Sequence, residues 1–359
     1  MKVNLSEVHV DDGVRNAVKS VLDSGWFIHG SKLSEFEKDF ARFVNNKFAI
    51  GVSSGTSAIH LALTAMNVGR GDRIIVPSHT AFPTVEPILN LGAIPLFVDV
   101  DPLTYTIDPK IITKSMLRSA KGMLVVHLYG HPADLSPLSE MARANGLFLI
   151  EDCAQAAGSM YKGRRVGSFG DLSCFSFYPS KNMTVCGDGG MVVTEDPTLD
   201  GKIRLLRNHG MSSKYEHQIL GYNYRMSEIS AAVGIQQLKV LENANNARRT
   251  WAKAYRDLMH TFPVRLPAEK RWGHHVYHLF VIQTKKRDRL VAHLQRKGIS
   301  TGIHYPIPCH LQPPIPPKLR GRLPHTEKLV SEILSLPMYP QLTQEKVQYV
   351  CDAVREFVT

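Results

Sequence analysis

The stretch LFLIEDCAQ, residues 147–155, joins a short apolar run to two consecutive acids. A run that is apolar on both faces is typical of a strand buried in a parallel sheet. An acid at the carboxyl end of such a strand points into the crevice where open α/β sheets bind ligands. Taken alone, Asp152 fits equally well as the cap of a following helix. The stretch therefore predicts a parallel strand and leaves two readings of its acid.

Similar apolar runs lie on both sides of this stretch, at residues 73–76, 95–98 and 123–126. Helical segments are expected between them at 57–66 and at 136–144, the second with Ser136 as N-cap and Pro137 at its first position. This alternation predicts an α/β fold whose mostly parallel central sheet is covered on both faces.

The remaining segments suggest two domains, a large one over 1–240 and a small C-terminal α/β domain over 241–359. A helix over 31–44 places five apolar residues on one face, where they are expected to pack in the core: Leu33, Phe36, Phe40, Phe43 and Val44. A long helical pattern covers 225–260 and leads into the small domain. There we expect a strand at 276–283, helices at 287–297 and 343–357, and a functional Pro-rich loop at 305–317.

Composition narrows the class of protein. Of the 359 residues, 43% are hydrophobic and 21% are charged, which is typical of a globular protein and excludes disorder or a coiled coil. No apolar run approaches the ~20 residues that span a bilayer, and the first residues resemble no signal peptide, so a cytoplasmic location is expected. The net charge of +11 is compatible with nucleic acid, but scattered basic groups and the lack of a binding motif favour an enzyme with anionic ligands.

The five cysteines have no metal-ligand spacing, so no metal site and a reducing compartment are expected. Cys153 and Cys186 are expected to be packing residues near the active site.

Two further motifs could hold an anion and a reactive amine. In GVSSGTSA, residues 51–58, small residues open a helix whose N-terminal N–H groups can bind a phosphate, although ordinary capping explains the same letters. In SCFSFYPSKN, residues 173–182, a strand ends in a loop that carries Lys181, and a Gly-rich turn follows. A Schiff-base lysine, a carboxylate and an anion cradle are what pyridoxal phosphate requires. The three motifs together therefore predict a pocket for this cofactor.

With these motifs the chain resembles the DegT-type sugar aminotransferases of the aspartate-aminotransferase (fold type I) superfamily. The resemblance extends over nearly the whole chain and includes these segments: SGWFIHG (24–30), SSGTSA (53–58), EDCAQA (151–156), FSFYPSKN (175–182), GDGG (187–190), RNHG (207–210), GYNYRMSE (221–228), IHYP (303–306) and SLPMYP (335–340).

The resemblance implies a role for each matching residue. Lys181 matches the Schiff-base lysine and proton carrier, and relatives that dehydrate sugars have histidine there. Asp152 matches the acid that pairs with the pyridine nitrogen, and Gln155 the residue beside the phenolic oxygen. The phosphate ligands match Thr56, Ser57 and Ser176, with Asn223 and Arg225 reaching the partner subunit's phosphate. Substrate contacts match Phe27, His29, His304 and Tyr305, the first two in an N-terminal segment, 1–30, that forms part of the substrate loop. The usual ring-stacking aromatic is replaced by Ala81, which makes Phe82 a candidate.

The implied function is that of a homodimeric, pyridoxal 5'-phosphate-dependent aminotransferase with a shared active site. It would move an amino group from L-glutamate to a keto sugar linked to a nucleoside diphosphate, by a ping-pong mechanism through an internal aldimine on Lys181. Three alternatives remain open: an aminotransferase of keto-cyclitols from antibiotic pathways, a regulatory protein with a vestigial cofactor site, and a sugar dehydratase, which Lys181 disfavours.

Overall fold

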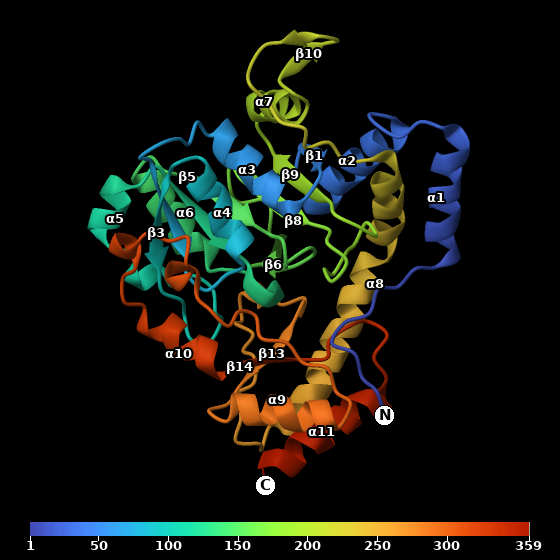
Figure 1. The fold of residues 1–359 in the computed structure, drawn as a ribbon, viewed down its shortest axis with the longest axis vertical. Helices are drawn as coiled ribbons and strands as arrows, with labels where there is room; N and C mark the ends of the chain where they lie inside the picture. Colours follow the sequence, from blue (N-terminus) through green and yellow to red (C-terminus); the bar gives the residue numbers. More distant parts are fainter. Residues whose placement is uncertain (359) are drawn as a thin grey trace.

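The computed structural model describes residues 1–358 and contains a seven-stranded sheet in the order β1-β9-β8-β5-β4-β2-β3 (Figure 1). Its strands are β1 (Phe48–Val52), β2 (Arg73–Pro77), β3 (Ile94–Val98), β4 (Gly122–Val126), β5 (Phe148–Asp152), β8 (Leu172–Ser176) and β9 (Gly190–Thr194). Only β9 runs antiparallel to its neighbours. The predicted mostly parallel sheet is confirmed, and each predicted apolar run overlaps one of its strands.

Helices cover both faces of this sheet because successive residues of each strand point to opposite sides. In β4, Met123 and Val125 belong to one core cluster, whereas Leu124 belongs to the other. The first cluster includes residues of α2 (Ser31–Val44), α5 (Lys114–Ser119), α6 (Leu135–Ala144) and α8 (Glu228–Met259). The second includes residues of α3 (Gly55–Ala65), α4 (Phe82–Asn90) and α7 (Pro197–Arg207).

Helix α2 has the predicted bounds and the predicted apolar face, on which Phe43 is half-buried and the other four residues are buried. The predicted start of α6 is wrong. Its N-cap is Asp134 and Ser136 lies inside the helix, where its hydroxyl is a partner of Tyr161 and Lys162 rather than of the helix's own N–H groups.

A smaller unit packs at the far end of α8 and has its own core cluster. It contains β13 (Phe280–Gln283), β14 (Ile333–Leu336), α9 (Arg287–Arg296) and α11 (Gln344–Val358), with α10 (Pro324–Glu332) leading into β14. The N-terminus lies beside this unit in Figure 1, and α11, which ends at Val358, belongs to it. Strand β13 is shorter than expected at its start because Tyr277 has a φ of 44°, outside the extended range. The predicted boundary at 240 falls inside α8, which is continuous there.

A hairpin of β10 (Met211–Ser213) and β11 (Glu216–His217) projects from the body of the molecule, at the top of Figure 1. Tyr215 is 81% exposed and Leu220, which follows the hairpin, is 96% exposed. The remaining elements are α1 (Asp12–Ser24) along α8 and the short strands β6 (Met160–Tyr161), β7 (Arg164–Arg165) and β12 (Gly273–His274). Within residues 1–358, no helix has the length and apolar character that crossing a bilayer requires.

Candidate active site

A cavity of about 210 Å³ lies at the carboxyl ends of the parallel strands, where open α/β sheets bind ligands. It brings together all three sequence motifs. The predicted site residues that line it are Thr56, Asp152, Gln155, Ser176 and Lys181. The strand ends of β5 and β8 and the N-terminus of α3 therefore meet at one place, as their order in the chain predicts.

Lys181 projects into this cavity from the loop that follows β8. Its backbone N–H donates to the carbonyl of Tyr178 at 2.8 Å, which fixes a turn at this position. Burial lowers the pKa of Lys181 to about 8, and the nearby charge of Asp152 opposes the change. On the order of a tenth of this amine is thus neutral at pH 7, the form in which an amine can attack a carbonyl.

Asp152 ends β5 and is 3% exposed. Its Oδ2 accepts from the Thr84 hydroxyl at 2.8 Å, and its Oδ1 accepts from the Ala154 N–H at 3.0 Å. Burial raises the pKa of Asp152, while these donors and the charge of Lys181 act in the opposite direction. Of the two readings of this acid, the structure favours the one in which it faces a ligand cavity.

Gln155 joins the cavity to the loop that carries His304 and Tyr305. Its Oε1 accepts from the N–H of Tyr129 at 2.6 Å, and its Nε2 donates to the hydroxyl of Tyr305 at 3.0 Å. The Tyr129 hydroxyl in turn donates to the carbonyl of His304. These bonds bring the side chains of Gln155 and Tyr305 together, although they are 150 residues apart in the sequence.

His304 bonds to Ser335 through its Nδ1 at 2.9 Å. Burial, and to a smaller extent the charge of Lys181, lowers the pKa of His304 to about 4, so the imidazole is neutral at neutral pH. A neutral ring beside the lysine can accept or donate one hydrogen bond without adding positive charge.

The N-terminus of α3 supplies an anion cradle. Ser54 caps the helix, and its hydroxyl accepts from the N–H of Ser57. Within residues 1–358, the N–H groups of Gly55 and Thr56 have no hydrogen-bond acceptor. A Cβ on Gly55 would lie 2.7 Å from that of Ser176, so glycine permits the close approach of helix and strand. These groups fit a phosphate, and with Lys181 and Asp152 they fit pyridoxal phosphate.

Two predicted ligands point elsewhere. Ser57 does not line the cavity, because its hydroxyl is used within the capping box by Ser54. Phe82 is the first residue of α4 and packs against the core cluster on the α3 side. The cavity wall near it is formed by Ala81 and Pro83. The prediction that Phe82 covers the ring is therefore not supported by the placement of its side chain.

Six other predicted residues do not line this cavity in the single chain. His304 and Tyr305 are joined to it through Tyr129 and Gln155, and the other four lie elsewhere. Asn223 is exposed, and Arg225 donates to Asn208 at 3.3 Å. Phe27 is exposed, and His29 lines a separate pocket with Trp26 and Glu228.

Thr84 and Tyr129 touch the site residues but were not identified from the sequence. Thr84 lies in the first turn of α4, and its hydroxyl is 2.9 Å from that of Thr80, the residue before Ala81. Nothing in the letters around Tyr129 marks it as a partner of Gln155.

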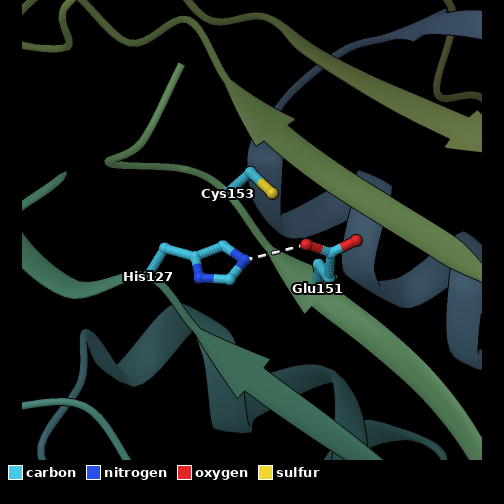
Figure 2. A group of neighbouring side chains, drawn as sticks. All are labelled: His127, Glu151 and Cys153. Atoms are coloured by element: carbon cyan, nitrogen blue, oxygen red, sulfur yellow. Dashed lines mark hydrogen bonds and ion pairs between the residues drawn. The ribbon is translucent and has the colours of Figure 1, made fainter. Parts of the chain in front are cut away.

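His127, Glu151 and Cys153 form a compact buried group behind the cavity (Figure 2). His127 Nδ1 accepts from the N–H of Ala133 at 3.0 Å, so Nε2 carries the proton that is donated to Glu151. Glu151 also accepts bonds from a serine hydroxyl and three backbone N–H groups. Burial tends to raise the pKa of Glu151, but these donors hold it below its usual range. The group is thus a saturated hydrogen-bond network whose lone pairs are already used.

The two cysteines of the motifs differ from each other. Cys153 is buried, as expected, and burial raises the pKa of its thiol well above the usual value. Cys186 is exposed, so its prediction as a packing residue is wrong. It has a φ of 59° in the Gly-rich turn, where the backbone directs its side chain outward.

Comparison with known proteins agrees with this site. A sequence profile of the DegT/DnrJ/EryC1/StrS aminotransferase family matches residues 9–355. The erythromycin biosynthesis sensory transduction protein EryC1 of Saccharopolyspora erythraea is 42% identical over 94% of this chain and 93% of its own. The dTDP-3-amino-3,4,6-trideoxy-alpha-D-glucose transaminase of Streptomyces venezuelae is 41% identical over 95% of this chain and 91% of its own.

Among solved structures, that of S. venezuelae DesV in complex with a ketimine intermediate superposes with a TM-score of 0.94. It is 40% identical and the match covers 99% of this chain and 98% of DesV. The chain therefore belongs to the DegT/DnrJ/EryC1/StrS aminotransferase family and is a pyridoxal-phosphate-dependent sugar aminotransferase.

Proposed function

We propose that this enzyme moves the amino group of L-glutamate to the keto carbon of a sugar linked to a nucleoside diphosphate. The observation that supports the proposal most directly is the meeting of Lys181 and Asp152 in one cavity with a helix N-terminus. The transaminase relative from S. venezuelae is named for a dTDP-linked amino sugar, which supports this class of substrate.

The bound cofactor supplies an electron sink for the carbon that exchanges its amino group. Lys181 would carry the proton between the two carbon positions, since its lowered pKa lets it both take and release a proton near neutral pH. Asp152 would hold the proton on the pyridine nitrogen, and Gln155 would lie beside the phenolic oxygen. Thr56 and Ser176 would bind the phosphate at the helix N-terminus, where the free N–H groups favour an anion.

We propose further that the enzyme is a homodimer with shared sites. Asn223 and Arg225 do not line the cavity of their own chain, and the exposed hairpin places apolar side chains in solvent. A second copy would cover these side chains and bring Asn223 to its phosphate. Phe27 and His29, also outside the cavity, would contact the sugar nucleotide together with His304 and Tyr305.

Absorption spectra and steady-state kinetics test the proposal. Protein purified with added cofactor should show a visible band that L-glutamate removes and that Lys181→Ala lacks. Initial rates with a panel of keto sugars linked to dTDP, UDP or GDP should give parallel double-reciprocal lines, as a ping-pong mechanism requires. Turnover of scyllo-inosose in preference to every nucleotide sugar would instead favour the cyclitol alternative. A visible band without turnover of any keto substrate would favour a regulatory role.

A further inference from the structure

A second cavity, of about 310 Å³, shares Lys181 with the cofactor cavity. It lies between the N-terminal segment, helix α8 and the loop after β8, and its wall includes Asn182, Ala244, Arg248 and Gln341. A molecule in this second cavity would contact Lys181. The cavity is therefore placed to receive a substrate of the reaction.

Arg248 is a buried cation in the wall of this cavity, with 3% of its surface exposed. Its Nη1 donates to the carbonyls of Met338, Tyr277 and His278 at 2.8, 3.4 and 3.5 Å. Its Nε is buried and has no hydrogen-bond partner, and no carboxylate of residues 1–358 pairs with it.

Neutral carbonyl groups do not balance the charge of this guanidinium. Burial lowers the pKa of Arg248 to about 10, yet the group stays charged at neutral pH. Buried charges in proteins are ordinarily paired, so an unpaired one beside a cavity points to an anionic ligand.

Asn182, next to the reactive lysine, also has an unused polar atom. Its Nδ2 donates to Asn245 Oδ1 at 2.7 Å and to the carbonyl of Val276 at 3.0 Å, which leaves Oδ1 buried without a partner. The acids in the cavity wall are engaged elsewhere: Asp11 caps α1, and Glu7 lies 3.9 Å from Lys346. The cavity wall thus contains one positive charge without an acidic partner, while the free oxygen of Asn182 is enclosed by protein.

We propose that Arg248 binds the distal carboxylate of the amino donor, so that the second cavity selects a dicarboxylic amino acid. The planar guanidinium carries a charge that no acid balances, and carboxylates are its best-matched partners. The inference rests on the proposed function, because it assumes that an amino acid charges the enzyme from this side of Lys181. It accounts for a buried arginine without an acidic partner at this position.

The test compares two donors on the holoenzyme. L-glutamate has the distal carboxylate and L-alanine lacks it, and the loss of the visible band reports each half-reaction. Arg248→Gln should raise the half-saturating concentration of L-glutamate by roughly tenfold to a hundredfold, which is the loss expected for a charge-assisted hydrogen bond. The reaction with L-alanine should stay within about twofold of its wild-type rate. Arg249→Gln is the matched control, because Arg249 pairs with Glu269 at 2.6 Å outside this cavity.

A second variant keeps the test decisive if Arg248→Gln fails to fold. Ala244 lies one turn before Arg248 on α8, so Ala244→Glu adds a carboxylate at i, i+4 spacing that pairs with the buried guanidinium. It should fold and lose L-glutamate saturation in the same way, whereas Ala244→Gln, of the same size, should lose much less. Competitive inhibition by glutarate should disappear in parallel.

Equal sensitivity of L-glutamate and L-alanine to Arg248→Gln, or equal effects of Ala244→Glu and Ala244→Gln, would overturn the inference. Failure of the donor proposal looks different: wild-type enzyme would then show no loss of its band with L-glutamate. Inhibition by glutarate that still depends on Arg248 would in that case support the dicarboxylate site alone.

Discussion

Lys181 and Asp152 control each other's charge across the cofactor cavity. Burial favours the neutral form of both groups, and the attraction between them favours the charged form. Thr84 and the Ala154 N–H stabilise the carboxylate further, so the aspartate has more support for its charge than the lysine. These donors oppose the effect of burial on the aspartate, but burial still has the larger effect on the pKa of both groups.

The lysine predicts a pH dependence of stability in the cofactor-free protein. Its folded pKa of about 8 lies below the ordinary value of 10.5, so between these values the unfolded chain binds more protons. The wild-type free energy of unfolding should therefore gain, relative to Lys181→Met, up to about 3 kcal/mol as the pH rises through this window. Urea denaturation at about pH 7.5, 9 and 10.5 measures the difference in the free energy of unfolding between the two proteins. Lys253→Met, at an exposed position of α8, is the control, and a constant Lys181→Met difference would contradict the prediction.

Helix α3 shows how an element can be both a core helix and a binding device. Its body packs between the sheet and α4, while its first turn leaves two N–H groups free beside Ser176. The price of this arrangement is a close contact at Gly55, where no side chain fits. The cradle therefore depends on one glycine more than on any hydroxyl group around it.

Alanine substitutions at Gly55 and at a second helical glycine, Gly201, should separate the effect of a packing clash from the effect of helix propensity. Gly55→Ala places a Cβ 2.7 Å from Ser176 Cβ, so the helix must shift and we expect at least a tenfold weaker affinity for the cofactor. Gly201→Ala in α7 meets open space and should stabilise the protein by roughly 0.5–1 kcal/mol. Fluorescence titration with pyridoxal phosphate and thermal denaturation measure the two effects. Unchanged cofactor affinity in Gly55→Ala would show that the close approach is unnecessary.

For the helices and strands, the sequence predicted the features that follow from the spacing of apolar residues. The buried strands and the apolar face of α2 follow from local patterns, and each is present. The cap of α6 and the late start of β13 depend on tertiary partners: Tyr161 engages Ser136, and Tyr277 adopts a positive φ. The local sequence favours Ser136 as the N-cap, but the contact of its hydroxyl with Tyr161 overrides that preference.

The site divides in the same way. Lys181, Asp152 and Ser176 could be found because each ends a strand or begins the loop after it, and parallel strand ends converge. The role of Phe82 stays a prediction: this residue begins α4, and its side chain packs against the core cluster on the α3 side. Tyr129 could not be found from the sequence, because its role depends on a contact with Gln155. Arg248 could not be found either, because the sequence does not show that its Nε lacks a partner among residues 1–358.

In the whole molecule, several apolar side chains have no cover in the single chain. Trp26 is 63% exposed. Phe27 and Ile28, in the same loop before α2, and Leu220, after the hairpin, are also exposed. Exposed apolar residues that gather in this way mark interaction surfaces. The two cavities contain Lys181 and Arg248, cations that suit anionic ligands, and these are a small part of the net charge of +11.

A shared active site predicts complementation between two inactive variants. Lys181→Ala and Asn223→Ala should each lose activity as pure dimers, because one lacks the reactive amine and the other the contact to its partner's phosphate. Co-expressed, they form mixed dimers in which one site has both Lys181 and a partner with intact Asn223. Random pairing in a two-fold dimer should then restore about a quarter of wild-type activity.

The matched control is the pair Lys181→Ala and Asp152→Asn, whose lesions lie in the cavity of one and the same chain. Every site in that mixed dimer keeps one lesion, so no activity should return. Analytical ultracentrifugation of each variant verifies that dimers form before activity is compared. Recovery in neither pair would mean that Asn223 acts within its own chain. Recovery in the control pair as well would mean that regained activity does not report a shared site. Recovery in the first pair alone would place Asn223 across the subunit boundary, which the fold of one chain leaves open by holding this residue in solvent.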